Sequence, residues 1–213
     1  MSAETDLILE PRRPPSGKLT YEEFLDWCDE DTWAEWVDGR VIPMPVTVAE
    51  RHAAILSFLI TLFKLATRFG RLGAVYAEPF QMRLATARRG RSPDVMFVAP
   101  EHRDRLRRHY LEGPADIVVE ITSPESVQRD RVEKLAEYER AGVPEYWLVD
   151  PEQQHVELRV LGPEGRYRVA FAGSSGAYQS TVLPRLRLRV EWLWQEPGPE
   201  LDAIVRELDA EPS

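Results

Sequence analysis

A single acidic residue inside a continuous apolar run constrains the fold of this chain more than any other feature. Glu120 lies in the run from Ile117 to Ile121, where the remaining four residues are all Ile or Val. Such runs are typical of strands that are covered on both faces of a sheet. A carboxylate buried there costs several kcal/mol unless it is compensated. We therefore expect a metal ion, a lysine, or both beside Glu120.

The length and composition favour one domain without a membrane segment. The 213 residues allow a single sizeable core, no stretch has the length of a bilayer span, and Met1–Glu10 lacks the apolar segment of a signal peptide. Cys28 is the only cysteine, which excludes an intrachain disulfide and a Cys-rich zinc site. It is better explained as a small apolar residue than as a nucleophile. These features predict a cytoplasmic protein with no membrane partner.

Hydrophobic periodicity and turn residues predict the order of the elements. We expect a disordered segment over residues 1–18, one domain over residues 19–195, and an acidic tail or helix over residues 196–213. The expected helices are a short one that Thr20 caps and that reaches Cys28, and two longer ones over residues 46–69 and 123–141. The expected strands cover residues 33–37, 40–44, 76–84, 93–98, 116–122, 145–150, 156–160, 167–171 and 186–190.

The strand with Glu120, the helix over residues 123–141 and the strand over residues 145–150 form a β–α–β unit. The two strands should therefore be parallel, with a right-handed crossover. The whole order predicts an α/β fold with a mixed central sheet, helices on both faces, and extra β-hairpins, the first of them around Asp38-Gly39.

The helix over residues 123–141 directs a lysine at the sheet. Val127, Tyr138 and Ala141 lie seven before, four after and seven after Lys134, so these residues share one helical face. This face should pack on the sheet, with Lys134 as a charge partner for the buried carboxylates. A side chain whose ammonium reaches water is the alternative. The residues expected to point away from the sheet are Glu133, Glu137 and Arg140.

Asp94, at the start of a strand, and Glu120, in the next strand, are candidate metal ligands. Carboxylates together with a strand carbonyl, such as that of Ile121, suit hard ions such as Mg²⁺ or Mn²⁺. The ion would bind a phosphate oxygen and lower the pKa of an attacking water. Lys134 would orient that water and offset the charge that builds up on the phosphorane.

Basic charge is concentrated in one segment although the chain is acidic as a whole. The net charge is −9, yet residues 81–110 carry eight arginines against three acids, a local net charge of +5. Local charge sets the field that a polyanion meets. We expect Arg88, Arg89 and Arg91 to contact DNA phosphates, and a solvated basic loop is an equally good explanation.

Glu35 and His52 are weaker candidates for the same site. Glu35 could supply a third carboxylate near the metal, or it could be an exposed acid. His52 lies near the start of a long helix, where a histidine is more often a cap or a core hydrogen-bonding residue than a general base. The tryptophans, Trp36 and Trp147 among them, are better explained as core or dimer surface than as base-stacking residues.

Several motifs, in order along the chain, resemble one group of nucleases. Ser92-Pro93-Asp94 followed by Glu120-Ile121-Thr122-Ser123-Pro124 resembles the PD-(D/E)XK nuclease superfamily. Further motifs make residues 20–188 similar to the Uma-two family of restriction endonucleases. These motifs are Trp36–Val41, His52, Arg131–Leu135 and Gly142–Asp150.

The resemblance implies a restriction-endonuclease-like fold and a metal-dependent phosphodiesterase, with Asp94 and Glu120 as metal ligands. Thr122 stands where the superfamily has its lysine. In the family this role has moved to the following helix, which matches the helical face that carries Lys134.

Residues and resemblance together predict an endonuclease that hydrolyses DNA with Mg²⁺ or Mn²⁺ and acts as a homodimer. Two alternatives stay open. One is the same fold as a catalytically silent module that binds nucleic acid or protein, and the other is a structural oligomerisation protein. Carboxylates that share an ion should make the melting temperature depend on Mn²⁺, whereas a silent or structural protein should show no dependence.

Overall fold

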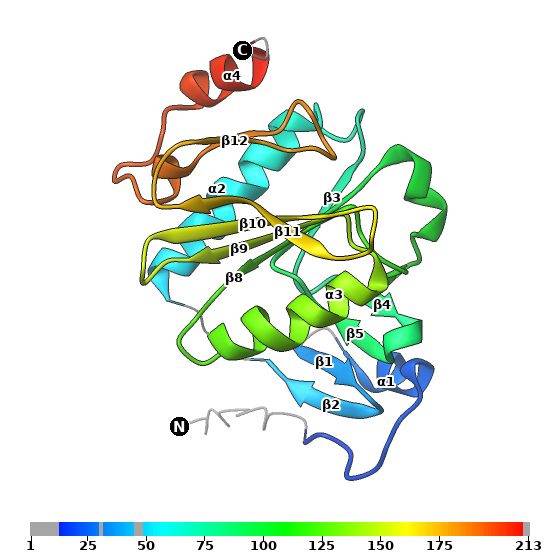
Figure 1. Cartoon of the computed structure of the whole chain (residues 1–213). Helices are drawn as coiled ribbons and strands as arrows, with labels where there is room; N and C mark the ends of the chain where they lie inside the picture. The colour runs from blue at the N-terminus through cyan, green and yellow to red at the C-terminus, as the bar shows by residue number, and fades with distance from the viewer. Residues whose placement is uncertain (1–12, 30–31, 45–48, 211–213) are drawn as a thin grey trace, which may run out of the picture.

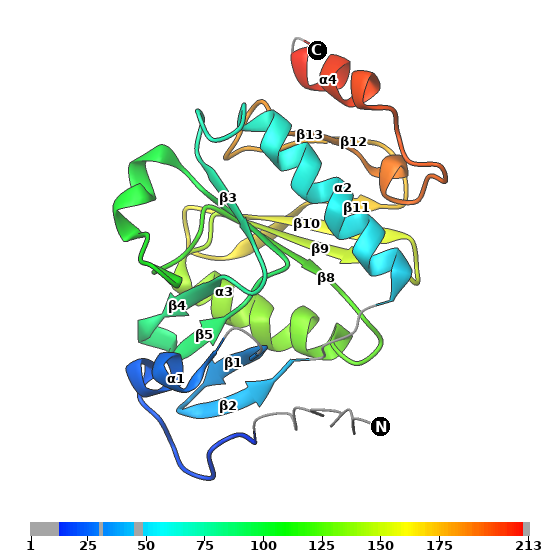
Figure 2. The same ribbon diagram turned by 180° about the vertical axis from the view of Figure 1, so that it is seen from behind.

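The computed structural model describes residues 13–29, 32–44 and 49–210 of the chain. Within these residues the strands form a six-stranded sheet, a five-stranded sheet and a two-stranded ribbon. The six-stranded sheet runs through the middle of the molecule, with α2 (Glu50–Ala66) on one face and α3 (Leu135–Ala141) on the other (Figures 1 and 2). This is the mixed α/β architecture that the sequence predicts.

The six-stranded sheet has the order β11-β10-β9-β8-β6-β3. Strands β8 (Ile117–Ile121) and β9 (Glu145–Asp150) are parallel, which confirms the strand pairing of the predicted β–α–β unit. The other neighbouring pairs are antiparallel, including β6 (Val95–Val98) on β8. The remaining strands are β3 (Ala74–Ala77), β10 (His155–Leu161) and β11 (Tyr167–Gly173).

The five-stranded sheet, in the order β2-β1-β5-β4-β7, contains the N-terminal strands. The predicted hairpin is confirmed as β1 (Ala34–Val37) and β2 (Arg40–Pro43). Its turn residues Asp38 and Gly39 have positive φ values of 51° and 90°, as a type I′ turn requires. Helix α1 (Tyr21–Trp27) begins with the predicted capping box. The remaining strands are β4 (Gln81–Leu84), β5 (Arg89–Arg91) and β7 (Tyr110–Glu112).

The chain leaves one sheet for the other at Glu78-Pro79. The prediction of a single strand over residues 76–84 is wrong, because β3 ends at Ala77 and β4 begins at Gln81 in the other sheet. Proline has no N–H to donate to a strand ladder, so pairing stops at this point. The break leaves Glu78 at the junction between the two sheets.

The long helices agree with the predicted ranges except at their ends. Helix α2 stops at Ala66, and Arg68 and Phe69 beyond it have positive φ values of 50° and 52°. Residues 46–48 of the predicted helix lie outside the described residues. The helix predicted over residues 123–141 contains a π-helical segment, η3 (Arg129–Lys134), that continues into α3. The other elements are β12 (Ala177–Gln179), β13 (Arg187–Arg189), α4 (Leu201–Asp209), and the 3₁₀ helices η1 (Ala85–Ala87), η2 (Pro100–Arg105) and η4 (Val190–Leu193).

Alternation along the central strands divides the interior into two cores. Ile117, Val119 and Ile121 of β8 pack in the core with α2, whereas Val118 packs in the core with α3 and the five-stranded sheet. Side chains two apart in a strand point to the same face, so Glu120 points toward α3 like Val118. The pleat of β8 therefore places this carboxylate under the helix that carries a lysine.

The C-terminal helix packs on the first of these cores. Ile204 and Leu208 of α4 are buried in the core that contains α2. Helix α4 lies within the segment predicted as an acidic tail or helix, whereas residues 1–12 of the predicted N-terminal segment lie outside the described residues.

A buried ion network joins the five-stranded sheet to α3. Arg91 of β5 is 1% exposed and donates hydrogen bonds to Glu35 of β1 at 2.7 Å and to Glu137 of α3 at 2.8 and 2.9 Å. Neighbouring Arg89 also binds Glu137, at 2.5 Å. These contacts fix the helix against the sheet through the buried charges of Arg91, Glu35 and Glu137, with the partly exposed Arg89 at the edge.

The position of Glu137 corrects the predicted helical face. The prediction that Glu137 points away from the sheet is wrong, because it is buried beside Arg91. Glu137 lies three residues after Lys134 in the α-helix that follows η3, and side chains three apart in an α-helix lie on the same side, so Glu137 faces the sheet with Lys134. Tyr138 is buried as predicted, whereas Val127 and Ala141 are only half-buried.

We predict that Arg91→Met lowers the free energy of unfolding by about 3–5 kcal/mol, because it removes the fully buried cation that hydrogen-bonds both Glu35 and Glu137. Urea denaturation measures this change. Arg88→Met is the matched control, since Arg88 is exposed and its loss should change stability by less than about 0.5 kcal/mol. Equal denaturation midpoints for the two variants would contradict the assigned network.

Candidate functional site

Asp94 is fixed at the point where β6 begins beside β8. The two strands are antiparallel with Val95 opposite Val119, so Asp94 lies next to the end of β8 that carries Glu120. Its Oδ2 accepts the N–H of Ile121 at 2.5 Å. The two predicted carboxylates therefore come from adjacent strands, as expected.

Lys134 lies directly on Glu120. Its Nζ donates to Glu120 Oε2 at 2.7 Å, and the Tyr138 hydroxyl donates to Oε1 of the same carboxylate at 2.6 Å. The ammonium is also 3.3 Å from Asp130 Oδ1 and 3.6 Å from Glu35 Oε1. Lys134 is 1% exposed, so the alternative in which its ammonium reaches water is wrong.

Burial and neighbouring charges shift the pKa values of Lys134, Glu35 and Glu120 in opposite directions. Burial alone would lower the pKa of Lys134, but Glu120, Glu35 and Asp130 outweigh it and raise that pKa, so the lysine stays protonated. Burial would raise the pKa of Glu35, but Lys134 and Arg91 hold it at about 2. Burial raises the pKa of Glu120 even though Lys134 opposes the shift. Glu35 is therefore a charged buried acid rather than an exposed one.

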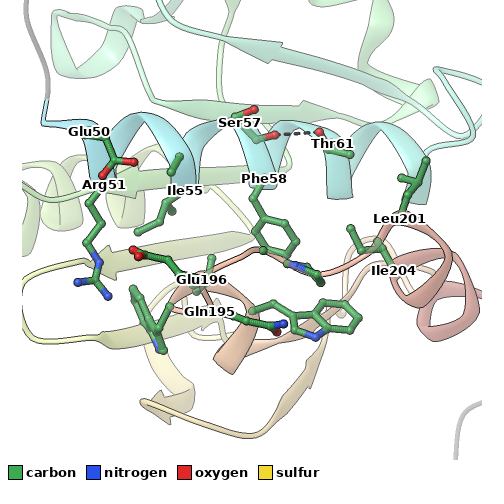
Figure 3. Close-up of a pocket in the computed structure, with 16 residues that line it drawn as sticks. Glu50, Arg51, Ile55, Ser57, Phe58, Thr61, Gln195, Glu196, Leu201 and Ile204 are labelled. Carbon is green, nitrogen blue, oxygen red and sulfur yellow. Dashed lines mark hydrogen bonds between the residues drawn. The ribbon is translucent and has the colours of Figure 1, made fainter.

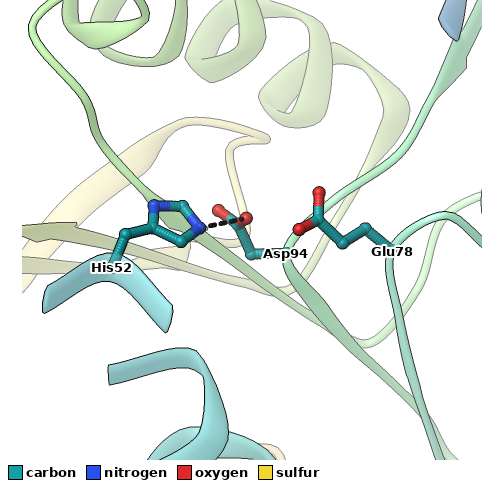
Figure 4. Close-up of side chains that lie close together, drawn as sticks. All are labelled: His52, Glu78 and Asp94. Atoms are coloured by element: carbon teal, nitrogen blue, oxygen red, sulfur yellow. Dashed lines mark ion pairs between the residues drawn. The ribbon is translucent and has the colours of Figure 1, made fainter. Parts of the chain in front are cut away.

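His52, Glu78 and Asp94 form the second half of the site (Figure 4). One ligand atom from each lies within 4.8 Å of the others, and His52 Nε2 is 3.2 Å from Asp94 Oδ1. Among the described residues this is the one group of three such side chains that could hold an ion. Burial would lower the pKa of His52, but Asp94 outweighs it and raises the pKa.

The geometry of this cluster fits a metal ion. His52 Nε2 is buried and has no hydrogen-bond partner among the described residues. Its distance to Asp94 Oδ1 is close to the roughly 3 Å between neighbouring ligands of an octahedral ion with bonds of about 2.1 Å. An imidazole with two carboxylates suits Mn²⁺ or another transition ion better than Mg²⁺.

The predicted ligand set differs from this cluster in two members. Asp94 belongs to it, but both oxygens of Glu120 already accept hydrogen bonds. Ile121 contacts Asp94 through its N–H, whereas its carbonyl was the predicted ligand. His52 and Glu78 take their places in the cluster.

One cavity of about 710 Å³ is lined by the ion-binding cluster and by Glu120, Asp130 and Lys134. Arg51, Ser92 and Arg129 also line it. A second cavity of about 370 Å³ lies between α2 and the segment that leads to α4, and its walls include Ile55, Phe58 and Ile204 (Figure 3). Arg51 lines both cavities, but the second contains none of the ion-binding cluster.

The three arginines predicted to contact phosphate lie in different surroundings. Arg91 is buried in the ion network, and Arg89 pairs with Glu137 and with Asp38 at 2.8 Å. Arg88 is exposed. The prediction of a phosphate contact is therefore kept for Arg88 alone.

Comparison with known proteins identifies the family of the chain. The profile of the Uma2 family, described as "Putative restriction endonuclease", matches residues 21–191. The chain belongs to the Uma2 family. This confirms the resemblance that the sequence motifs indicate, and it places the Uma2 match over both sheets and the whole cavity.

A solved structure supports the Uma2 fold. A crystal structure from Anabaena variabilis ATCC 29413, described as a "putative nuclease belonging to DUF820", is similar with a TM-score of 0.67 and 18% sequence identity. The similarity covers 89% of this chain and 99% of that chain, and it shows that the two share a fold. No curated protein matches this Uma2 chain. In the described residues, no helix combines the length and hydropathy needed to cross a membrane.

The sequence analysis of this Uma2 protein did not predict two residues of the candidate site, Glu78 and Asp130. Glu78 reaches the site because the chain breaks between the sheets at Pro79, and an acid directly before a proline at a strand end is the only local signal. Asp130 lies four residues before Lys134 and contacts it, so a search for acids one turn from the lysine would have found it.

We predict that Mn²⁺ raises the melting temperature more at about pH 8 than at about pH 6, because burial and nearby Asp94 raise the pKa of Glu78 to about 7. In the metal-free protein this proton stabilises the folded state fully below the ordinary pKa of 4.5, and the contribution is lost as pH rises through about 7. An ion binds the deprotonated carboxylate, so its effect grows in the opposite direction.

Thermal unfolding with and without Mn²⁺ at both pH values measures this difference. Glu78→Gln should remove most of the Mn²⁺ response, whereas Glu101→Gln, at an exposed position, should leave it unchanged. A Glu78→Gln protein with the full response at both pH values would remove Glu78 from the site.

Proposed function

We propose that this Uma2 protein is a divalent-metal-dependent endonuclease that hydrolyses DNA phosphodiester bonds. The observation that carries the proposal is a buried ammonium, Lys134, in the same cavity as His52, Glu78 and Asp94. Cations fixed beside an ion-binding cluster in a nuclease fold suit a reaction that builds negative charge on phosphorus.

His52, Glu78 and Asp94 would hold the ion, and Mn²⁺ is favoured over Mg²⁺ by the imidazole. When bound, such an ion supplies Lewis acidity and lowers the pKa of a water molecule. The chain itself orients its ligands: the Ile121 N–H fixes Asp94, and α2 fixes His52 in its first turn.

Lys134 is suited to stabilise charge on the phosphate. Among the described residues, only its contact with Glu120 has hydrogen-bond geometry, so the ammonium has N–H groups left for substrate oxygens. Asp130 and Glu35 lie close enough to hold it in place and to keep it protonated. Tyr138 occupies the other oxygen of Glu120, which makes Glu120 a positioning residue for Lys134.

A catalytically silent module that binds nucleic acid or protein is the second candidate. One observation favours it: both oxygens of Glu120, the second carboxylate of the superfamily motif, are hydrogen-bonded within the protein. In such a module the charged residues of the cavity would stabilise the fold and would take no part in catalysis. Homodimer formation and a cytoplasmic location also stay predictions.

We predict that Lys134→Met reduces Mn²⁺-dependent cleavage of plasmid DNA by about 10²-fold or more, because it removes a charge contact made in the transition state. The apolar stem is kept, and the raised pKa of Glu120 lets that acid take up a proton. Initial rates of nicking and linearisation measure the effect, with thermal unfolding recorded in parallel.

Lys64→Met is the matched control, since Lys64 is exposed on α2. Its cleavage rate should equal that of the wild type. A wild-type protein that cleaves neither plasmid nor single-stranded DNA with Mn²⁺, together with a Lys134→Met protein that is only less stable, would favour the silent module.

DNA is the proposed partner, and Arg88 the proposed phosphate contact outside the cavity. We predict that Arg88→Ala weakens binding of a DNA duplex and reduces the slope of log affinity against log salt by about one unit for the lost contact. Fluorescence anisotropy at several salt concentrations measures the slope. An unchanged slope would leave Arg88 as part of a solvated loop.

A further inference from the structure

Polar atoms without partners gather in the cavity. In the described part of the chain, eight buried side-chain nitrogen or oxygen atoms have no hydrogen-bond partner, and four of them belong to residues that line this cavity. The four atoms are His52 Nε2, Ser92 Oγ, Arg129 Nε and Asp130 Oδ1. Two of the four atoms are in ion pairs, His52 Nε2 with Asp94 at 3.2 Å and Asp130 Oδ1 with Lys134 at 3.3 Å. Buried polar atoms in folded proteins nearly always have partners, so Ser92 Oγ and Arg129 Nε are the two that indicate a missing ligand.

The atoms differ in the charged groups that surround them. His52 Nε2 lies beside Asp94 in the ion-binding cluster, and Asp130 Oδ1 lies 3.3 Å from the Lys134 ammonium. Arg129 Nε differs from both, because a guanidinium is always charged and can only donate. Its unpaired N–H therefore requires an acceptor, and an anion is the best one.

Within the part of the chain that the structure describes, Arg129 has no such acceptor. There the nearest carboxylate oxygen, Oδ1 of Asp130, is 3.9 Å from Arg129 Nε, beyond hydrogen-bond distance. By contrast, Arg131 on the same segment binds Asp150 at 3.1 Å. The side chain of Arg129 is 28% exposed, so an incoming ligand can reach it.

The π-helical segment places this arginine and the lysine on one site. Arg129 begins η3 and Lys134 ends it, five residues apart. Since a π turn bonds residue i to residue i+5, the two backbones lie one turn apart along the helix. Both residues line the cavity, so two cations from a single helical turn face the space beside the ion-binding cluster.

We propose that Arg129 binds a non-bridging oxygen of the substrate phosphodiester, an inference that rests on the proposed function. The cavity is lined by six acids, which repel a phosphate: Glu78, Asp94, Glu120, Glu125, Asp130 and Glu152. An ion held by the cluster would neutralise part of this charge, and Arg129 supplies a donor that no carboxylate of the described residues binds. A planar guanidinium matches phosphate geometry better than an ammonium does.

The test compares the wild type with Arg129→Gln, Arg129→Lys and Arg140→Gln. Arg140 is an exposed residue of the same helix, so its substitution changes net charge equally without touching the cavity. For each protein we would measure the Mn²⁺-induced rise in melting temperature, kcat and KM for plasmid cleavage with Mn²⁺, and affinity for a short DNA duplex in Ca²⁺.

Arg129→Gln should keep the Mn²⁺ response and lower kcat/KM for plasmid cleavage by about 10²-fold, because it removes a contact to the phosphodiester. Arg129→Lys should recover part of this loss, and Arg140→Gln should match the wild type. Cleavage by Arg129→Gln within about threefold of the wild type would overturn the inference while leaving the nuclease intact. Loss of the Mn²⁺ response in Arg129→Gln and Arg129→Lys would also overturn it, because Arg129 would then support the metal site.

The same measurements distinguish failure of the proposed endonuclease activity from failure of the proposal for Arg129. If the wild type binds the duplex but does not cleave it, the proposed endonuclease is wrong, and duplex affinity alone decides the role of Arg129. A loss of about tenfold in Arg129→Gln would then support phosphate binding, and equal affinity would overturn it. A wild type that neither binds nor cleaves DNA overturns both.

Discussion

The ion pair between Glu120 and Lys134 is the interaction on which the rest of the site depends. The pleat of β8 turns Glu120 inward, where it cannot stay charged without a cation, and the following helix supplies one 2.7 Å away. The crossover that makes β8 and β9 parallel also carries Lys134 over the sheet. The segment between β8 and β9 therefore determines both the parallel pairing of these strands and the position of Lys134 beside Glu120.

The charges around this pair are poorly explained by stability alone. Buried ion pairs are often no better for stability than apolar residues of the same volume. Here Glu35 lies within 3.6 Å of Lys134, and Glu35 and Glu137 are both paired with Arg91. In the described residues, half of the buried polar atoms without a hydrogen bond belong to residues that line the cavity. The buried charge is therefore concentrated where a substrate can enter.

Strand patterning and helical spacing were enough to predict that Asp94, Glu120 and Lys134 lie close together, because both signals act over a few residues, and the roles of the three side chains stay predictions. Glu78 and Arg91 depend on distant contacts. Glu78 reaches the site only because the chain changes sheets at Pro79, which periodicity cannot reveal, and Arg91 looked like part of a basic loop because its acids lie over 40 residues away in sequence. The orientation of Glu137 could have been predicted, because a residue three after Lys134 lies on the same side of an α-helix.

The ion network also determines when the site can exist during synthesis of the chain. Glu35 lies in the first hairpin, and Lys134, which it approaches within 3.6 Å, emerges from the ribosome about a hundred residues later. A nascent chain that has made β1 and β6 has the acids but not the cation. The proposed cleavage of DNA therefore requires a chain that has been synthesised at least as far as Lys134 and has folded.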